Sequence, residues 1–262
     1  MTTQKAPQQS IIVFEQPVDD ISRIALRFEH LYRLANHHLP CEDQYDGQIC
    51  LQAVMELMML LDRPEIRSKY YQEVSRLISI LARLKQRTDI NPERLELTLD
   101  SLTNIQTILR HWNGKFAQGL HQESFIKSLS QQQHTPGGLC TVTLPGFYHW
   151  TQQSLSKQEA DLRAWLHEFS SFNTIITTLM GVYRQSTQLQ SVEAVQGFYQ
   201  ATLDPQTPCH LIRVFVNREH NVYPRISTGR HGVSIRFTCA DAHAPLEKSH
   251  RDIDFRLASC AI

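Results

Sequence analysis

Five arginines lie close together near the C-terminal end of the chain. Glu219 is the only acidic residue between Pro205 and Ala240, whereas this segment contains Arg213, Arg218, Arg225, Arg230 and Arg236. Five positive charges minus one leave a surplus of four, although Lys+Arg and Asp+Glu both number 26 in the whole chain. A guanidinium binds carboxylate and phosphate groups through paired hydrogen bonds, so the segment indicates anion recognition. Solvated arginines that protect sheet edges from aggregation would explain it about equally well.

The other reactive side chains do not form a recognisable site. His37, His38, Cys41 and Cys50 suggest a metal, but a structural zinc site usually needs ligands in paired short spacings. The sequence has no GxSxG, HExxH or glycine-rich phosphate-binding motif. We therefore expect no metal, no cofactor and no enzymatic activity.

The composition is that of an ordinary globular protein. Hydrophobic residues make up 41% and charged residues 20% of 262 residues, which is enough chain for one large domain or two small ones. No apolar run is long enough to span a membrane, and the N-terminal segment MTTQKAPQQS is polar, so we expect a cytoplasmic protein. The six scattered cysteines are expected to be free thiols.

Helical periodicity dominates the first two thirds of the chain. Ile21, Ile24, Phe28, Leu31 and Ala35 form an apolar stripe after a capping residue, Asp19 or Asp20, and Arg23 and Arg27 lie one turn apart off that stripe. Further helices are expected at 47–62 (capped by Asp46), 64–85, 88–112, 122–132 and 156–186, with partial helicity at 192–203.

Alternating apolar residues predict strands at both ends of the chain and one in the middle. The expected strands are 10–17, 139–144, 209–217, 222–227, 233–238 and 252–260. The strand at 139–144 lies between a Pro-Gly-Gly turn and Pro145-Gly146, and it needs partners because a lone strand is not stable.

These patterns predict an α+β fold with segregated helices and strands. We expect a mostly helical body from residues 18–135 and 146–204. We expect a β domain from 10–17, 136–145 and 205–262, with its strands in one small, mainly antiparallel sheet.

Several segments resemble the ZapD family of bacterial cell division proteins. They are TPGGLCTVTLPGFYHW (135–150), VYRQSTQLQSVEAVQGFYQ (182–200), YPRISTGRHGVSIRF (223–237) and DIDFRLASC (252–260), and VFEQPVDDISRIALRFEHL (13–31) resembles the family's first strand and helix. They occur in the family's order and span nearly the whole chain.

The resemblance implies a homodimer that binds the C-terminal tail of the tubulin-like protein FtsZ in a basic pocket and bundles FtsZ protofilaments at midcell. Family arginines match Arg23, Arg27, Arg63 and Arg236, whereas one family arginine falls on Gly232. With Arg225 and Arg230 from the charge surplus, the expected tail-binding residues are Arg23, Arg27, Arg63, Arg225, Arg230 and Arg236.

Two other functions remain open at this point. The arginine-rich strands suit nucleic-acid binding, although zero net charge is unusual for such a domain. A small-molecule enzyme is the third possibility, and no catalytic motif supports it.

Overall fold

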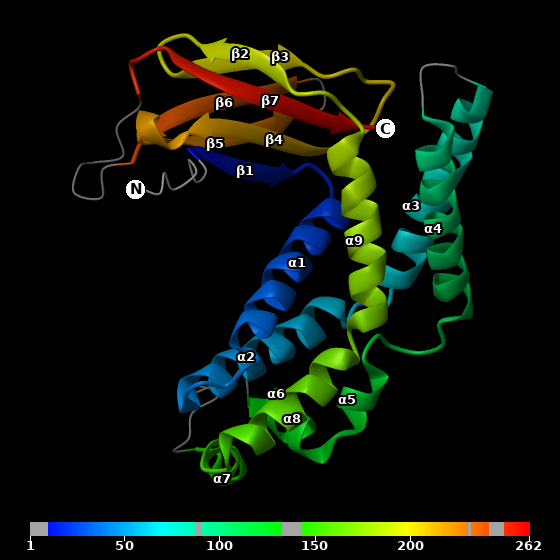
Figure 1. Ribbon diagram of the computed structural model, residues 1–262, viewed down its shortest axis with the longest axis vertical. Helices are drawn as coiled ribbons and strands as arrows, with labels where there is room; N and C mark the ends of the chain where they lie inside the picture. Colours follow the sequence, from blue (N-terminus) through cyan, green and yellow to red (C-terminus); the bar gives the residue numbers. More distant parts are fainter. Residues whose placement is uncertain (1–9, 87–90, 133–142, 230–231, 241–248) are drawn as a thin grey trace, which may run out of the picture. The chain divides into compact units, whose positions relative to one another are not determined.

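The computed structural model describes residues 10–86, 91–132, 143–229, 232–240 and 249–262 (Figure 1). The chain divides into two compact units. The sheet unit comprises Met1–Arg23 and Gly181–Ile262, and the helical unit comprises Ile24–Met180. The boundaries fall inside two helices, α1 (Asp20–His38) and α9 (Ser170–Gln185), which each contribute to both units.

The helical unit contains the expected helices, except that the segment 156–186 forms two helices, α8 and α9, and that α5 and α7 were not predicted. The helices are α1, α2 (Gln44–Leu61), α3 (Ile66–Arg83), α4 (Pro92–His111), α5 (Gln118–Gln122), α6 (Ser124–Gln132), α7 (Pro145–Thr151), α8 (Leu155–His167) and α9. The rings of Phe28, Tyr70 and Phe116 each lie 4.7–5.3 Å from the ring of Phe172, so an aromatic cluster joins α1, α3 and α9. None of the helices described is long and apolar enough to cross a lipid bilayer.

Two helix boundaries differ from the sequence-based predictions. Asp46 does not cap α2, because the N-cap is Asp43 and Asp46 completes a capping box from the third helical position. Pro145 occupies the first turn of α7, a helix that the sequence analysis did not predict, and its missing N–H costs no hydrogen bond there. The predicted strand 139–144 lies outside the described residues except for its last two.

The sheet unit contains two antiparallel sheets. Sheet 1 has the order β1-β4-β7-β2, and sheet 2 has the order β3-β6-β5. The strands are β1 (Ile11–Pro17), β2 (Gln190–Ala194), β3 (Phe198–Thr202), β4 (Cys209–Asn217), β5 (Val222–Gly229), β6 (Gly232–Cys239) and β7 (Ile253–Ala261). The predicted α+β class is confirmed, but the expectation of a single sheet is wrong.

The two sheets pack face to face around one apolar core. Val214 of β4 and Phe255 of β7 come from sheet 1, and Ile235 and Phe237 of β6 come from sheet 2. Alternation sets this arrangement, since every second side chain of these strands points into the core and the others point outward. The segment 192–203, expected to be partly helical, instead forms most of β2 and β3.

Candidate functional site

An arginine-bearing row crosses the outer face of sheet 2. The register pairs Phe198 of β3 with Arg236 of β6, and Arg236 with Arg225 of β5. These three residues, here called the arginine row, therefore lie side by side across the three strands. Arg225 and Arg236 are exposed, and Phe198 retains 37% of its accessible surface.

The strand pattern explains why these side chains point outward. Val233, Ile235 and Phe237 are at most 1% exposed and face the core, so Arg236 between them faces solvent. On β5, Ile226 packs against the core cluster, which directs Arg225 to the opposite face. Arg225 and Arg236 therefore lie on the same, outer face of sheet 2.

A tight turn places Phe198 beside Arg236. Gln196 and Gly197 both have positive φ, 48° and 68°, as in the two-residue turns that suit antiparallel strands. The guanidinium carbon of Arg236 lies 4.8 Å from the centroid of the Phe198 ring. This is a cation–π contact, and the guanidinium carries five N–H donors with which Arg236 can bind an acceptor.

The row is electrostatically unbalanced. Like charges directly opposite each other on neighbouring strands are destabilising, and Arg225 faces Arg236. The strands β3, β5 and β6 contain no Asp or Glu. The adjacent row consists of Gln200, Ser234 and Ser227, which supply neutral hydrogen-bonding groups. An anion that bridges the two guanidinium groups would relieve their repulsion.

The other predicted site residues are distributed over both units. Arg23, in the sheet unit, is 61% exposed and lies 3.8 Å from Asp20 of the same helix turn. Arg27, in the helical unit, forms an ion pair with Glu56 of α2, so a bound carboxylate would have to compete with Glu56. Arg63 is exposed just beyond the end of α2. Arg230 lies outside the described residues.

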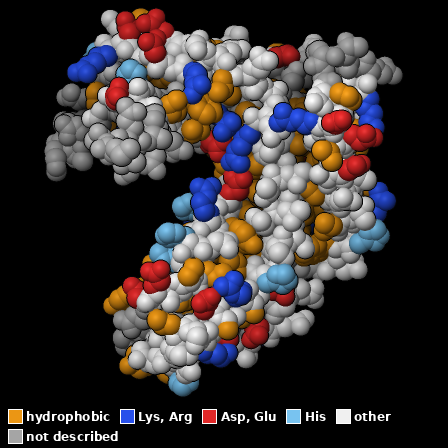
Figure 2. All heavy atoms as spheres, in the orientation of Figure 1, with side chains coloured by type: hydrophobic (Ala, Val, Ile, Leu, Met, Phe, Trp, Pro, Cys, Tyr) orange, Lys and Arg blue, Asp and Glu red, His pale blue; other side chains and the backbone are white. Residues whose placement is uncertain are grey.

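Arg213, one of the five arginines between Pro205 and Ala240, already binds an acidic side chain. Arg213 points outward from β4 in sheet 1, where its Nε atom donates to Glu15 Oε1 at 2.8 Å. Over the visible face of the molecule, basic and acidic side chains are interspersed (Figure 2), as expected from the net charge of zero. The arginine row stands out because it lacks acidic neighbours on its own strands.

His38, one of the residues that suggested a metal site, contacts Asp46. Nδ1 of His38 lies 2.6 Å from Oδ1 of Asp46. Among the described residues, no group of three or more His, Cys, Asp or Glu side chains is placed to hold a metal ion. Burial raises the pKa of Cys50 and of Cys260 to about 12, so both thiols stay protonated and unreactive at neutral pH.

Comparison with known proteins identifies the family. The model of the ZapD family, described as a cell division protein, matches residues 26–236. The chain belongs to the ZapD family. This assignment confirms the resemblance found in the sequence and supports a role in cell division.

Curated relatives cover nearly the full length of the chain. A cell division protein ZapD of Coxiella burnetii (strain RSA 493 / Nine Mile phase I) is 30% identical over 253 residues, which are 96% of this chain and 98% of the relative. The ZapD protein of Azoarcus sp. (strain BH72) is 26% identical over 252 residues, covering 96% and 100% of the two chains. That of Chromobacterium violaceum is 27% identical over 251 residues, covering 95% and 99%.

Phe198 was missed as a candidate site residue. Its neighbour in the aromatic segment GFYQ, Tyr199, packs against the core. The available signal was alternation in FYQAT, which places Phe198 and Tyr199 on opposite faces of a strand.

Proposed function

We propose that this ZapD-family chain binds the acidic, partly apolar C-terminal tail of FtsZ and, as a homodimer, cross-links FtsZ protofilaments into bundles at the midcell division site in the cytoplasm. The observation that carries the proposal is the arginine row, which combines two adjacent guanidinium groups with an exposed aromatic ring. The family assignment supports the cell-division context. The proposal concerns a binding protein, with no catalytic step.

The arginine row suits a peptide that carries both carboxylate and apolar groups. A carboxylate bound between Arg225 and Arg236 would receive charge-assisted hydrogen bonds from both and separate their positive charges. Phe198 offers an apolar surface for a neighbouring side chain of the peptide. Arg23, Arg27, Arg63 and Arg230 remain proposed tail contacts that lie outside this row.

Bundling requires two binding sites in one particle. A filament displays many tails, so a dimer that holds one tail of each of two filaments gains effective concentration. Linked binding of this kind exceeds the affinity of one contact by roughly a hundredfold or more when the geometry permits both contacts. Individual tail contacts can therefore be weak.

Co-sedimentation with FtsZ filaments tests the proposal. We expect the chain to pellet with full-length FtsZ and not with FtsZ that lacks its C-terminal tail. Arg236→Glu and Arg225→Glu should each reduce tail-peptide affinity at least tenfold, since a charge-assisted hydrogen bond contributes about 1.5–3 kcal/mol and reversal adds repulsion.

Arg218→Glu is the matched control, because Arg218 is an exposed arginine of the same unit outside the arginine row. If Arg225→Glu and Arg236→Glu bound the tail peptide with the same affinity as Arg218→Glu and the wild type, the arginine row would not be the tail site. Salt-dependent binding to random duplex DNA, without binding to the tail peptide, would favour the nucleic-acid function instead.

A further inference from the structure

Strand β5 lies at the edge of sheet 2 and carries one arginine of the arginine row. Sheet 2 has the order β3-β6-β5, so within the described part of the chain β5 pairs with a neighbour on one side alone. An edge strand presents backbone N–H and C=O groups with which a strand of another chain can pair. The hydrogen bonds of β6 show which groups of β5 point to the free side.

The backbone of Phe237 on β6 fixes this alternation. Its N–H donates to the carbonyl oxygen of Gly197 at 2.8 Å, and its C=O accepts from the N–H of Ser249 at 3.0 Å. Both groups therefore point away from β5, so Phe237 and its partner Pro224 form a non-hydrogen-bonded pair. The backbone of Pro224 accordingly points to the free side of β5, where its missing N–H costs no bond of the sheet.

Alternation assigns the other residues of β5. Ile226 and Thr228 also point their N–H and C=O groups to the free side. Arg225 and Ser227 bond to β6 instead. Among the described residues, no hydrogen bond reaches the backbone of Ile226 or Thr228 from the free side. The edge therefore offers an incoming strand the N–H and C=O groups of these two residues, together with the C=O of Pro224.

The side chains along β5 suit a strand in which acidic and apolar residues alternate. Arg225 is exposed on the outer face, and it forms no ion pair in the part of the chain that the structure describes. A residue opposite Arg225 across the free edge forms a non-hydrogen-bonded pair with it, in which side chains lie closest, so an acidic residue there neutralises the guanidinium. Ile226 is partly buried and packs against the core cluster, so the next residue of the strand meets an apolar surface.

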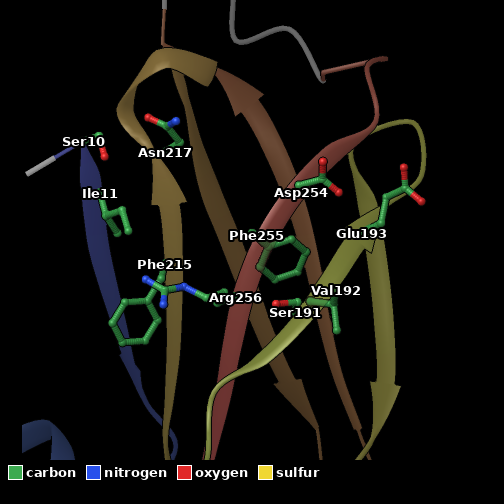
Figure 3. A pocket seen from close by; sticks show the side chains of 10 residues that line it. All are labelled: Ser10, Ile11, Ser191, Val192, Glu193, Phe215, Asn217, Asp254, Phe255 and Arg256. Atoms are coloured by element: carbon green, nitrogen blue, oxygen red, sulfur yellow. The ribbon is translucent and has the colours of Figure 1, made fainter.

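Two other places in the sheet unit are less suited to an acidic strand. On β3, the N–H of Phe198 donates to the carbonyl oxygen of Val195 at 3.0 Å, so the β2–β3 turn closes the start of that edge. The outer face of sheet 1 has a hollow of about 570 Å³ beside its edge strand β2 (Figure 3). Glu193 and Asp254 line this hollow directly opposite each other, and they would repel an acidic strand despite the nearby Arg256.

We propose that the free edge of β5 binds the tail peptide as an added strand, with an acidic residue opposite Arg225 and apolar residues against Pro224 and Ile226. The inference rests on the proposed function, and it adds the conformation of the bound peptide and the edge that holds it. In this mode of recognition, main-chain hydrogen bonds supply affinity and alternating side chains supply specificity. Arg236, on the next strand, adds a second positive charge to the same face.

N-methylation of single amides in a synthetic tail peptide tests the added strand. Only every second amide of the peptide points toward β5. Methylation should therefore lower the affinity about tenfold at alternate positions, and by less than about twofold at the positions between them. The intervening positions are matched controls, because they carry the same methyl group. Competition against a labelled peptide, followed by fluorescence anisotropy, measures the affinities.

Hydrogen exchange in the chain gives the reciprocal measurement. On saturation with the unmodified peptide, the amides of Ile226 and Thr228 should exchange about tenfold more slowly, whereas those of Arg225 and Ser227, which already bond to β6, should change little. Thr228→Pro should weaken peptide binding about threefold to tenfold, because it removes an N–H at the free edge. Thr228→Val keeps this N–H and should bind as the wild type does.

The outcomes separate this inference from the proposed function. Suppose that the peptide binds the wild type, that all its methylated forms bind alike, and that exchange at Ile226 and Thr228 is unchanged. This result would overturn the added strand and leave the arginine row as the tail site. Absence of binding by the unmodified peptide would overturn both. If Thr228→Pro does not fold, the methylation scan and the exchange measurement on the wild type still decide.

Discussion

At the scale of single residues, two arginines on strands of different sheets have different roles. Arg213 donates to Glu15 and lies 4.9 Å from the Phe215 ring, so its charge is balanced inside sheet 1. Arg236 stacks on Phe198 and has no acidic residue on its own or adjacent strands. Alternation of Val233, Ile235 and Phe237 in the sequence indicates that Arg236 points outward. It did not reveal which acidic side chain, if any, lies across the sheet.

Phe198 should contribute to tail binding without carrying charge. We expect Phe198→Ala to lower the affinity for the FtsZ tail peptide about twofold to fivefold, since an exposed cation–π contact is worth about 0.5–1 kcal/mol and the ring also positions Arg236. Fluorescence anisotropy with a labelled tail peptide measures the change. Val195→Ala is the control, because Val195 is 60% exposed at the same turn. Unchanged affinity of the Phe198 variant would exclude the ring from the site.

At the scale of elements, the β2–β3 hairpin was the largest error of the sequence-based prediction. VEAVQGFYQ contains helix-forming Glu, Ala and Gln, and its turn is Gln-Gly rather than the stronger Asn-Gly or Asp-Gly signal. The strands form because β2 pairs with β7 and β3 pairs with β6, partners at least 30 residues away in sequence. Tertiary pairing therefore overrides local propensity here.

Gly197 should be essential to that hairpin. Its φ is +68°, and a Cβ atom at this position would lie 2.3 Å from the backbone oxygen of Ser249. We expect Gly197→Ala to destabilise the protein by about 2 kcal/mol or more, combining left-handed strain with a backbone clash. Urea unfolding gives the difference. The neighbouring change Gln196→Gly should alter stability by less than about 0.5 kcal/mol; equal effects of both substitutions would contradict the assignment of the clash.

Glu15 should stabilise the junction of β1, β4 and α9 in a pH-dependent manner. Burial raises the pKa of its carboxyl, but Arg184 and Arg213 outweigh this effect, so the pKa lies below its ordinary value of 4.5. A depressed folded-state pKa stabilises the protein above the unfolded value, and this stabilisation is lost as pH falls through the folded value. We expect Glu15→Gln to cost about 2–3 kcal/mol at pH 7, because it leaves two arginines without their carboxylate.

The pH dependence separates this charge effect from packing. The difference in unfolding free energy between wild type and Glu15→Gln should shrink below pH 4.5 and approach zero where wild-type Glu15 is protonated. Denaturant titrations at pH 7, 5 and 3, in buffers of equal ionic strength, follow the change. A difference that is the same at all three pH values would mean that Glu15 acts through shape alone.

At the scale of the whole molecule, the α+β class followed from the order of periodic segments. The positions of the boundaries between the two units have no such signal, because they fall inside α1 and α9, where helical periodicity continues unchanged. The sequence did not indicate the number of sheets either. Alternation in β4, β6 and β7 shows that each strand has one buried face, but Val214, Ile235 and Phe255 carry no mark of the sheet to which each belongs.

The dimer should be required for bundling and not for binding one tail. We expect protein diluted until it is monomeric to bind an isolated tail peptide with unchanged affinity and to fail in bundling FtsZ filaments, because one site cannot bridge two filaments. Light scattering of assembled FtsZ measures bundling over the same range of protein concentration. Full bundling by the monomeric protein would contradict the bivalent mechanism.

The pairing of β1 with β4 has a consequence for synthesis of the chain. β1 leaves the ribosome first, yet Glu15 lies 198 residues before its partner Arg213. At about 5–20 residues per second, the segment IIVF therefore waits roughly 10–40 s as an unpaired apolar strand. Such a strand is open to aggregation and to chaperones. We therefore expect the sheet unit to fold only after β7 (Ile253–Ala261) has been synthesised.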